Sequence, residues 1–190
     1  MPESPVAPSL KRFFDRLVRR SLEDLRMGSD PAADYLAGLL ARFSRTDQLY
    51  ALRGTAGERL ETVVEMLLEV QRSWEFDQPH FDPFRERDVR QHIGDYTLFM
   101  TGLFPEFLAR QARSGLAVSR DAFLDHVRTG KRSYWVVSEF TLGTHGSVAP
   151  LFRKLSENFE LCVYGLGHVR AELDRLRDPA VRRVWGSLVE

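Results

Sequence analysis

Apolar residues recur every three or four positions along most of the chain, which is the spacing of an α-helix that buries one face. The stripe is clearest over residues 10–25, 36–43, 60–68 and 89–107. Aspartate-proline pairs at 30–31, 82–83 and 178–179 each supply a capping residue and a first-turn residue for a helix. The sequence therefore predicts an all-α fold, a single-domain helical bundle of about seven to eight helices.

The capping and glycine signals divide the chain into expected elements. We predict a disordered lead over residues 1–8 and one helical domain over 9–190. The expected helices are 9–27, 30–43, 58–73, 83–113, 119–130, 148–177 and a short one after 178, with an interruption of the central helix near Gly102 and Pro105. Residues 134–140 have strand propensity, but an isolated strand would have no partner, so we expect a helix there.

Charge and cysteine content exclude some classes of protein. The chain has 190 residues, with 27 basic and 27 acidic side chains, so no overall field attracts it to nucleic acid or to an anionic membrane. A single cysteine rules out an internal disulfide. No run of 18 apolar residues occurs, so we predict no membrane span and a cytoplasmic location.

The central helix carries polar residues among its apolar ones. His92, Asp95 and Tyr96 lie within one turn of each other, and Asp88 precedes His92 by one turn. An imidazole beside a carboxylate can act as a general base or bind a metal ion. The chain contains neither the Glu-x-x-His pairs of di-iron bundles nor a His-Glu-x-x-His motif, so we predict no metal site and favour a hydrogen-bonded structural histidine.

Two further polar residues fall within apolar patterns. Glu139 lies in the run 134–142, and we expect it to form a structural ion pair with an arginine; an exposed residue or a functional acid are the alternatives. Asn158 falls in a row with Leu155 and Cys162, which predicts a buried amide that fixes packing register, with a ligand contact as the alternative.

The first predicted helix carries the one candidate surface for nucleic acid, formed by Arg12, Arg16, Arg19 and Arg20. Aromatic residues that could stack on bases do not interleave with these arginines on the polar face. We therefore favour a solvated face over nucleic-acid binding, and we expect its arginines to pair with Glu23 or Asp24, or with Glu61, Glu65 and Glu69 of the helix at 58–73.

The segments RQHIGDYTLFMTGLFPE (90–106) and LFRKLSENFE (151–160) resemble those of an uncharacterised bacterial all-helical family. This resemblance would span most of the chain and implies an all-helical fold. It brings no activity, cofactor or site residue with it.

Two hypotheses for function remain open. The leading one is a protein that acts through association, foremost with itself, because 13 phenylalanines, 3 tryptophans and 5 tyrosines exceed what we expect one core to bury. The alternative is a small-ligand or metal-binding bundle, or an enzyme, with a polar pocket between the helices at 89–113 and 148–177. Its candidate ligand-binding residues are His92, Asp95, Tyr96, Glu139 and Asn158.

Overall fold

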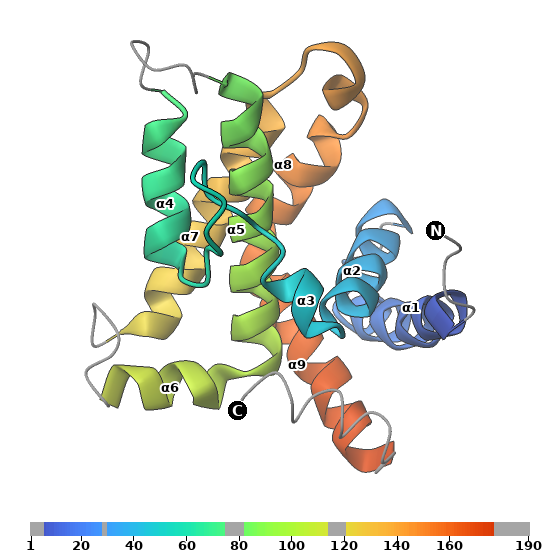
Figure 1. The fold of residues 1–190 in the computed structure, drawn as a ribbon. Helices are drawn as coiled ribbons and strands as arrows, with labels where there is room; N and C mark the ends of the chain where they lie inside the picture. The colour runs from blue at the N-terminus through green and yellow to red at the C-terminus, as the bar shows by residue number, and fades with distance from the viewer. Residues whose placement is uncertain (1–5, 28–29, 75–81, 114–120, 177–190) are drawn as a thin grey trace.

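The computed structural model describes residues 6–27, 30–74, 82–113 and 121–176. Within these ranges the chain forms nine α-helices, one 3-10 helix and no strand, which confirms the predicted all-α class (Figure 1). The elements are α1 (Val6–Asp24), α2 (Asp30–Phe43), α3 (Thr46–Leu49), α4 (Val63–Arg72), α5 (Pro83–Leu103), α6 (Pro105–Arg113), α7 (Ala122–Glu139), η1 (Gly143–Ser147), α8 (Ala149–Glu157) and α9 (Phe159–Leu176). None of the described helices is both long and apolar enough to cross a bilayer.

Helix α5 forms the centre of the fold, and α2, α4, α6, α7 and α9 pack around it (Figure 1). Every residue from Ile93 to Leu103 is buried. This continuous burial explains why α5 lacks a polar face in its second half, as expected for a helix surrounded by others. Gly102 lets α9 approach closely, because a Cβ atom there would lie 2.6 Å from Cβ of Leu166.

The predicted start and break of the central helix are confirmed. Asp82 caps α5 by accepting a hydrogen bond from the amide of Phe84 at 2.9 Å. The helix ends at Leu103, and α6 begins at Pro105, because a proline has no N–H to continue the backbone ladder.

Helix α7 corrects the prediction that a helix ends at Gly130. It continues to Glu139 and includes the residues with strand propensity, which are helical as expected. Gly130 is buried where a Cβ atom would overlap Thr97 and Phe159. The glycine is therefore a point of close packing between helices, which local sequence cannot distinguish from a helix terminator.

Three other helix boundaries differ from prediction. Helix α4 begins at Val63 and not near residue 58, because Thr62 and Glu65 form a reciprocal capping box. The long helix expected over 148–177 is divided at Asn158 into α8 and α9. Helix α1 begins at Val6, before Ser9; residues 1–5 and the short helix predicted after 178 lie outside the described residues.

Candidate functional site

Asp95 is the centre of a buried polar cluster that joins three helices. Its Oδ1 accepts hydrogen bonds from the hydroxyls of Tyr35 in α2, at 2.6 Å, and Tyr134 in α7, at 2.7 Å. Its Oδ2 accepts one from Arg42 of α2 at 2.6 Å. Gln91, one turn earlier in α5, donates to the Tyr35 hydroxyl at 3.2 Å. We call these five residues the Asp95 cluster.

The cluster is electrostatically coupled. Burial raises the pKa of the Asp95 carboxyl, and Arg42 and the two tyrosine hydroxyls oppose part of that rise because they stabilise the carboxylate. Burial and the Asp95 charge both raise the pKa of Tyr134. The tyrosines therefore stay protonated and serve as hydrogen-bond donors. The side chain of Arg42 is 43% exposed, so the cluster reaches solvent at this end.

His92 and Tyr96 flank Asp95 on α5 but contact other groups. His92 is half-buried, donates from Nε2 to the Leu49 carbonyl at 3.2 Å and packs against Phe43. Burial lowers its pKa, so the neutral imidazole is favoured. Tyr96 faces Tyr50, with ring centroids 6.4 Å apart, and burial raises its pKa. The histidine contact fits the favoured structural interpretation.

Glu139 and Asn158 lie away from the Asp95 cluster. Glu139 pairs with Arg153, which confirms the expected ion pair, and its side chain is 48% exposed at the end of α7, so the pair lies at the surface. Asn158 is half-buried and donates to the Lys154 carbonyl at 2.9 Å, so it terminates α8 and is not fully buried in a core row. The structure thus places the predicted pocket residues in separate surroundings, and only His92 and Asp95 act on each other.

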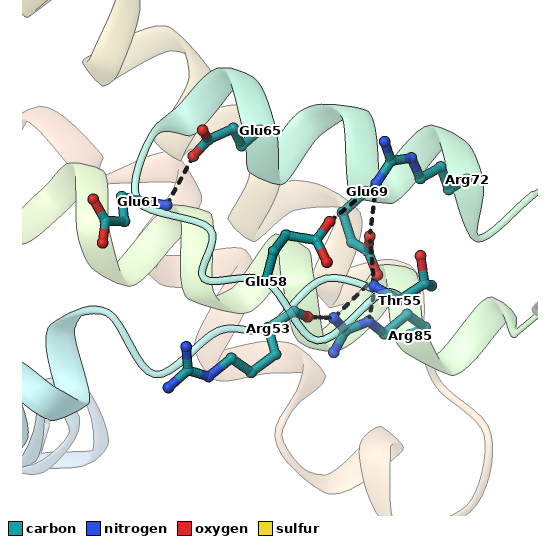
Figure 2. Close-up of polar contacts among 8 residues, drawn as sticks. All are labelled: Arg53, Thr55, Glu58, Glu61, Glu65, Glu69, Arg72 and Arg85. Atoms are coloured by element: carbon teal, nitrogen blue, oxygen red, sulfur yellow. Dashed lines mark hydrogen bonds and ion pairs between the residues drawn. The ribbon is translucent and has the colours of Figure 1, made fainter.

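Glu69 of α4 is a second buried carboxylate, although the four-residue spacing of Glu61, Glu65 and Glu69 opposite the apolar residues predicts an exposed acidic face for this helix. Its side chain is fully buried and accepts from Nε and Nη2 of Arg85 in α5, both at 3.1 Å (Figure 2). It also accepts from the amide of Thr55 at 3.3 Å. Arg85 donates in addition to the Arg53 carbonyl, so this cluster fastens the loop 53–59 onto α4 and α5. Helical spacing alone does not separate Glu69 from its exposed neighbours, because the contacts that bury it come from Thr55 and Arg85, which are 14 and 16 residues away in the sequence and outside α4.

The outward face of α4 is partly apolar. The apolar spacing over residues 60–68 predicts that Val64 and Leu68 lie in the core, yet their side chains are 49% and 47% exposed. The buried face consists of Met66, Glu69 and Val70. Since Glu69 takes a core position, the helix is rotated about its axis relative to the orientation that its apolar residues alone would favour.

The α1 arginines line a surface of mixed charge. Arg12, Arg16 and Arg20 are exposed, and Arg19 pairs at 2.9 Å with Asp15, an acid one turn earlier in α1 that was not among the expected partners. A groove of about 250 Å³ between α1 and α9 is lined by two arginines, Arg20 and Arg175, and two acids, Asp24 and Glu172, with His168 beside them. These opposite charges give no net attraction for a phosphate backbone.

Within the part of the chain that the structure describes, no group of three or more histidine, cysteine, aspartate or glutamate side chains is arranged to hold a metal ion. No protein-family model matches the chain, and comparisons with curated proteins and with solved structures find no match either. The resemblance of two segments to a bacterial helical family therefore stays a prediction.

Proposed function

We propose that this protein works by association with a second copy of itself. The observation that carries the proposal is the outward face of α4, where Val64 and Leu68 lie one turn apart and are about half exposed. Removal of adjacent apolar side chains from water by a partner is favourable, so such a surface promotes association. Helix α5 and the loop 53–59 both pack on α4, and Val64 and Leu68 stay accessible to another molecule.

The buried polar groups bear on this proposal because they hold the helices around α4 in fixed positions. The carboxylates of Asp95 and Glu69 are each held by an arginine and by further donors of this chain. Such groups connect helices and fix their packing register. They supply a rigid scaffold on which a surface can be presented for binding.

The experiment that tests the proposal is size-exclusion chromatography with light scattering on the full chain, loaded at increasing concentrations up to roughly 500 µM, a range suited to weak association. We expect the mean mass to rise from the 21.9 kDa of one chain towards twice that value. A mass that stays at one chain over the whole range would contradict the proposal.

We propose ligand binding at the Asp95 cluster as the second candidate. It is favoured by the Arg42 guanidinium, which is bound to a buried carboxylate and is still 43% exposed, so a small anion could reach it. Isothermal titration with inorganic phosphate and with acetate tests this candidate. Heat of binding that disappears in an Arg42→Gln variant is expected, and no heat with either anion would contradict it.

A further inference from the structure

We propose that two copies pack through α4 in antiparallel orientation, about a two-fold axis that passes near the midpoint between Val64 and Leu68. This inference rests on the proposed self-association and names the surface and the geometry that carry it. It uses the face formed by Glu61, Val64, Leu68, Gln71 and Arg72, all of which are exposed. We call these five residues the α4 face.

Helix periodicity places Val64, Leu68, Gln71 and Arg72 on one side of α4, because the steps between them are four, three and one residues. Glu61 lies just before the helix, next to its N-cap residue Thr62. Val63 and Leu67 are half-buried and pack against the core, so the apolar strip extends from the interior to the exposed face. A partner that covers Val64 and Leu68 would continue the core outward.

The charges of the α4 face decide the orientation. Glu61 precedes α4 and Glu65 lies in its first turn, while Arg72 is its last residue and pairs with Glu58 of the same chain at 3.3 Å (Figure 2). In an antiparallel pair Glu61 of each copy lies beside Arg72 of the other and joins its ion pair, while a parallel pair would bring the Glu61 and Glu65 side chains of the two copies together. Antiparallel packing also places the positive end of each helix dipole beside the negative end of the other, which is favourable.

The two-fold axis fixes which residues meet. With the axis level with position 66, Val64 of each copy lies against Leu68 of the other, and Glu61 lies against Gln71 with Arg72 next to it. Each contact occurs twice because the interface is isologous. Helix α4 has ten residues and is about 15 Å long, so it offers less than the roughly 800 Å² per partner of a stable interface. We therefore expect a modest affinity, with a dissociation constant on the order of 100 µM.

Sedimentation equilibrium of the full chain tests the surface. Leu68→Glu should weaken dimerisation at least about tenfold, because it places a charge in the apolar centre of the interface. Leu161→Glu is the matched control, since Leu161 in α9 is 42% exposed, close to the 47% of Leu68. The control should dimerise like the unmodified chain, and circular dichroism should show that both variants fold.

The outcomes separate this inference from the proposed function. If the unmodified chain dimerises and Leu68→Glu leaves the dissociation constant unchanged, the α4 face is refuted while self-association stands. If the unmodified chain remains monomeric at every concentration, the proposed function and the inference both fail.

Cysteine crosslinking tests the orientation. Chains carrying Val64→Cys and chains carrying Leu68→Cys are oxidised separately and as a mixture; the native Cys162 is buried. Antiparallel packing predicts that the mixture forms more disulfide dimer than either chain alone. A higher yield from each chain alone than from the mixture would indicate parallel packing and would overturn the inference.

Charge exchange provides an independent test. Glu61→Arg places a cation beside Arg72 of the second copy, and Gln71→Glu places an acid beside Glu61, so each single variant should weaken the dimer several-fold. The double variant Glu61→Arg/Gln71→Glu restores opposite charges at the contact and should recover the affinity. If the double variant instead weakens the dimer by the product of the two single effects, the predicted pairing is refuted.

Discussion

Replacement of Asp95 by alanine should destabilise the fold more strongly than most single substitutions. The carboxylate accepts hydrogen bonds from three side chains on two other helices, and no other acceptor for the Tyr134 hydroxyl is present among its described contacts. Tyr134 is fully buried, so its hydroxyl would lose its partner without gaining water. The variant therefore tests whether the Asp95 cluster holds α2, α5 and α7 together.

The magnitude follows from which groups are left without partners. An orphaned buried hydroxyl at Tyr134 costs about 1–3 kcal/mol. The Tyr35 hydroxyl loses one bond, worth about 1 kcal/mol, but keeps the one it accepts from Gln91. Arg42 is 43% exposed, so water replaces its partner and we assign it no cost. These costs sum to about 2–4 kcal/mol, and relief of the burial cost of Asp95 offsets part of them, so we expect a net loss of about 2 kcal/mol.

A double-mutant cycle in urea, followed by far-ultraviolet circular dichroism at neutral pH, measures the effect. Tyr134→Phe removes the hydroxyl that Asp95→Ala would orphan. In the phenylalanine background, Asp95→Ala should therefore cost about 1–2 kcal/mol less than in the native background. Additive losses, with a coupling below about 0.5 kcal/mol, would show that the hydroxyl does not depend on this carboxylate and would refute the reasoning.

Other predictions concern a helix cap, a packed glycine and a buried imidazole. Thr62→Ala removes the capping bond to the Glu65 amide and should lower the free energy of unfolding by about 1 kcal/mol in urea titrations, whereas Thr62→Ser should retain most of it. Gly102→Ala places a methyl group 2.6 Å from Leu166 Cβ, so we expect the melting temperature to fall by several degrees, for a loss of about 1–3 kcal/mol; an unchanged melting temperature would contradict the close packing of α5 and α9. Burial lowers the pKa of His92, so the unfolded chain takes up this proton at higher pH than the folded chain, and stability should fall as the pH decreases through about 6.5. The difference between the urea midpoints at pH 7.5 and 5.5 should become smaller in a His92→Gln variant, while His126, whose pKa burial also lowers, accounts for a remaining part. An undiminished difference would assign the pH dependence to groups other than His92.

Much of the helical layout follows from local sequence. The apolar spacing predicts the all-α class, and Asp82 and Pro105 fix the start and the end of the central helix because capping and a missing N–H act within one turn. The same local signals are ambiguous at Gly130, where a glycine either ends a helix or admits a neighbour. The close approach of Thr97 and Phe159 decides between these, and it arises from residues far apart in the chain.

The candidate site shows the same division. The sequence identifies Asp95 as a polar group within a buried stripe, because its neighbours are apolar at helical spacing. It does not identify Tyr35, Arg42 or Tyr134 as partners, since these are brought to the carboxylate only when α2 and α7 pack on α5.

Helix α4 marks the limit of what sequence periodicity determines. Its sequence fixes that a helix forms, and its capping box fixes where it begins. Which side faces inward is decided by Arg85 and by the loop 53–59, which bury Glu69 and leave Val64 and Leu68 at the surface. A charged side chain enters the interior only where partners compensate its lost hydration, and those partners come from elsewhere in the fold.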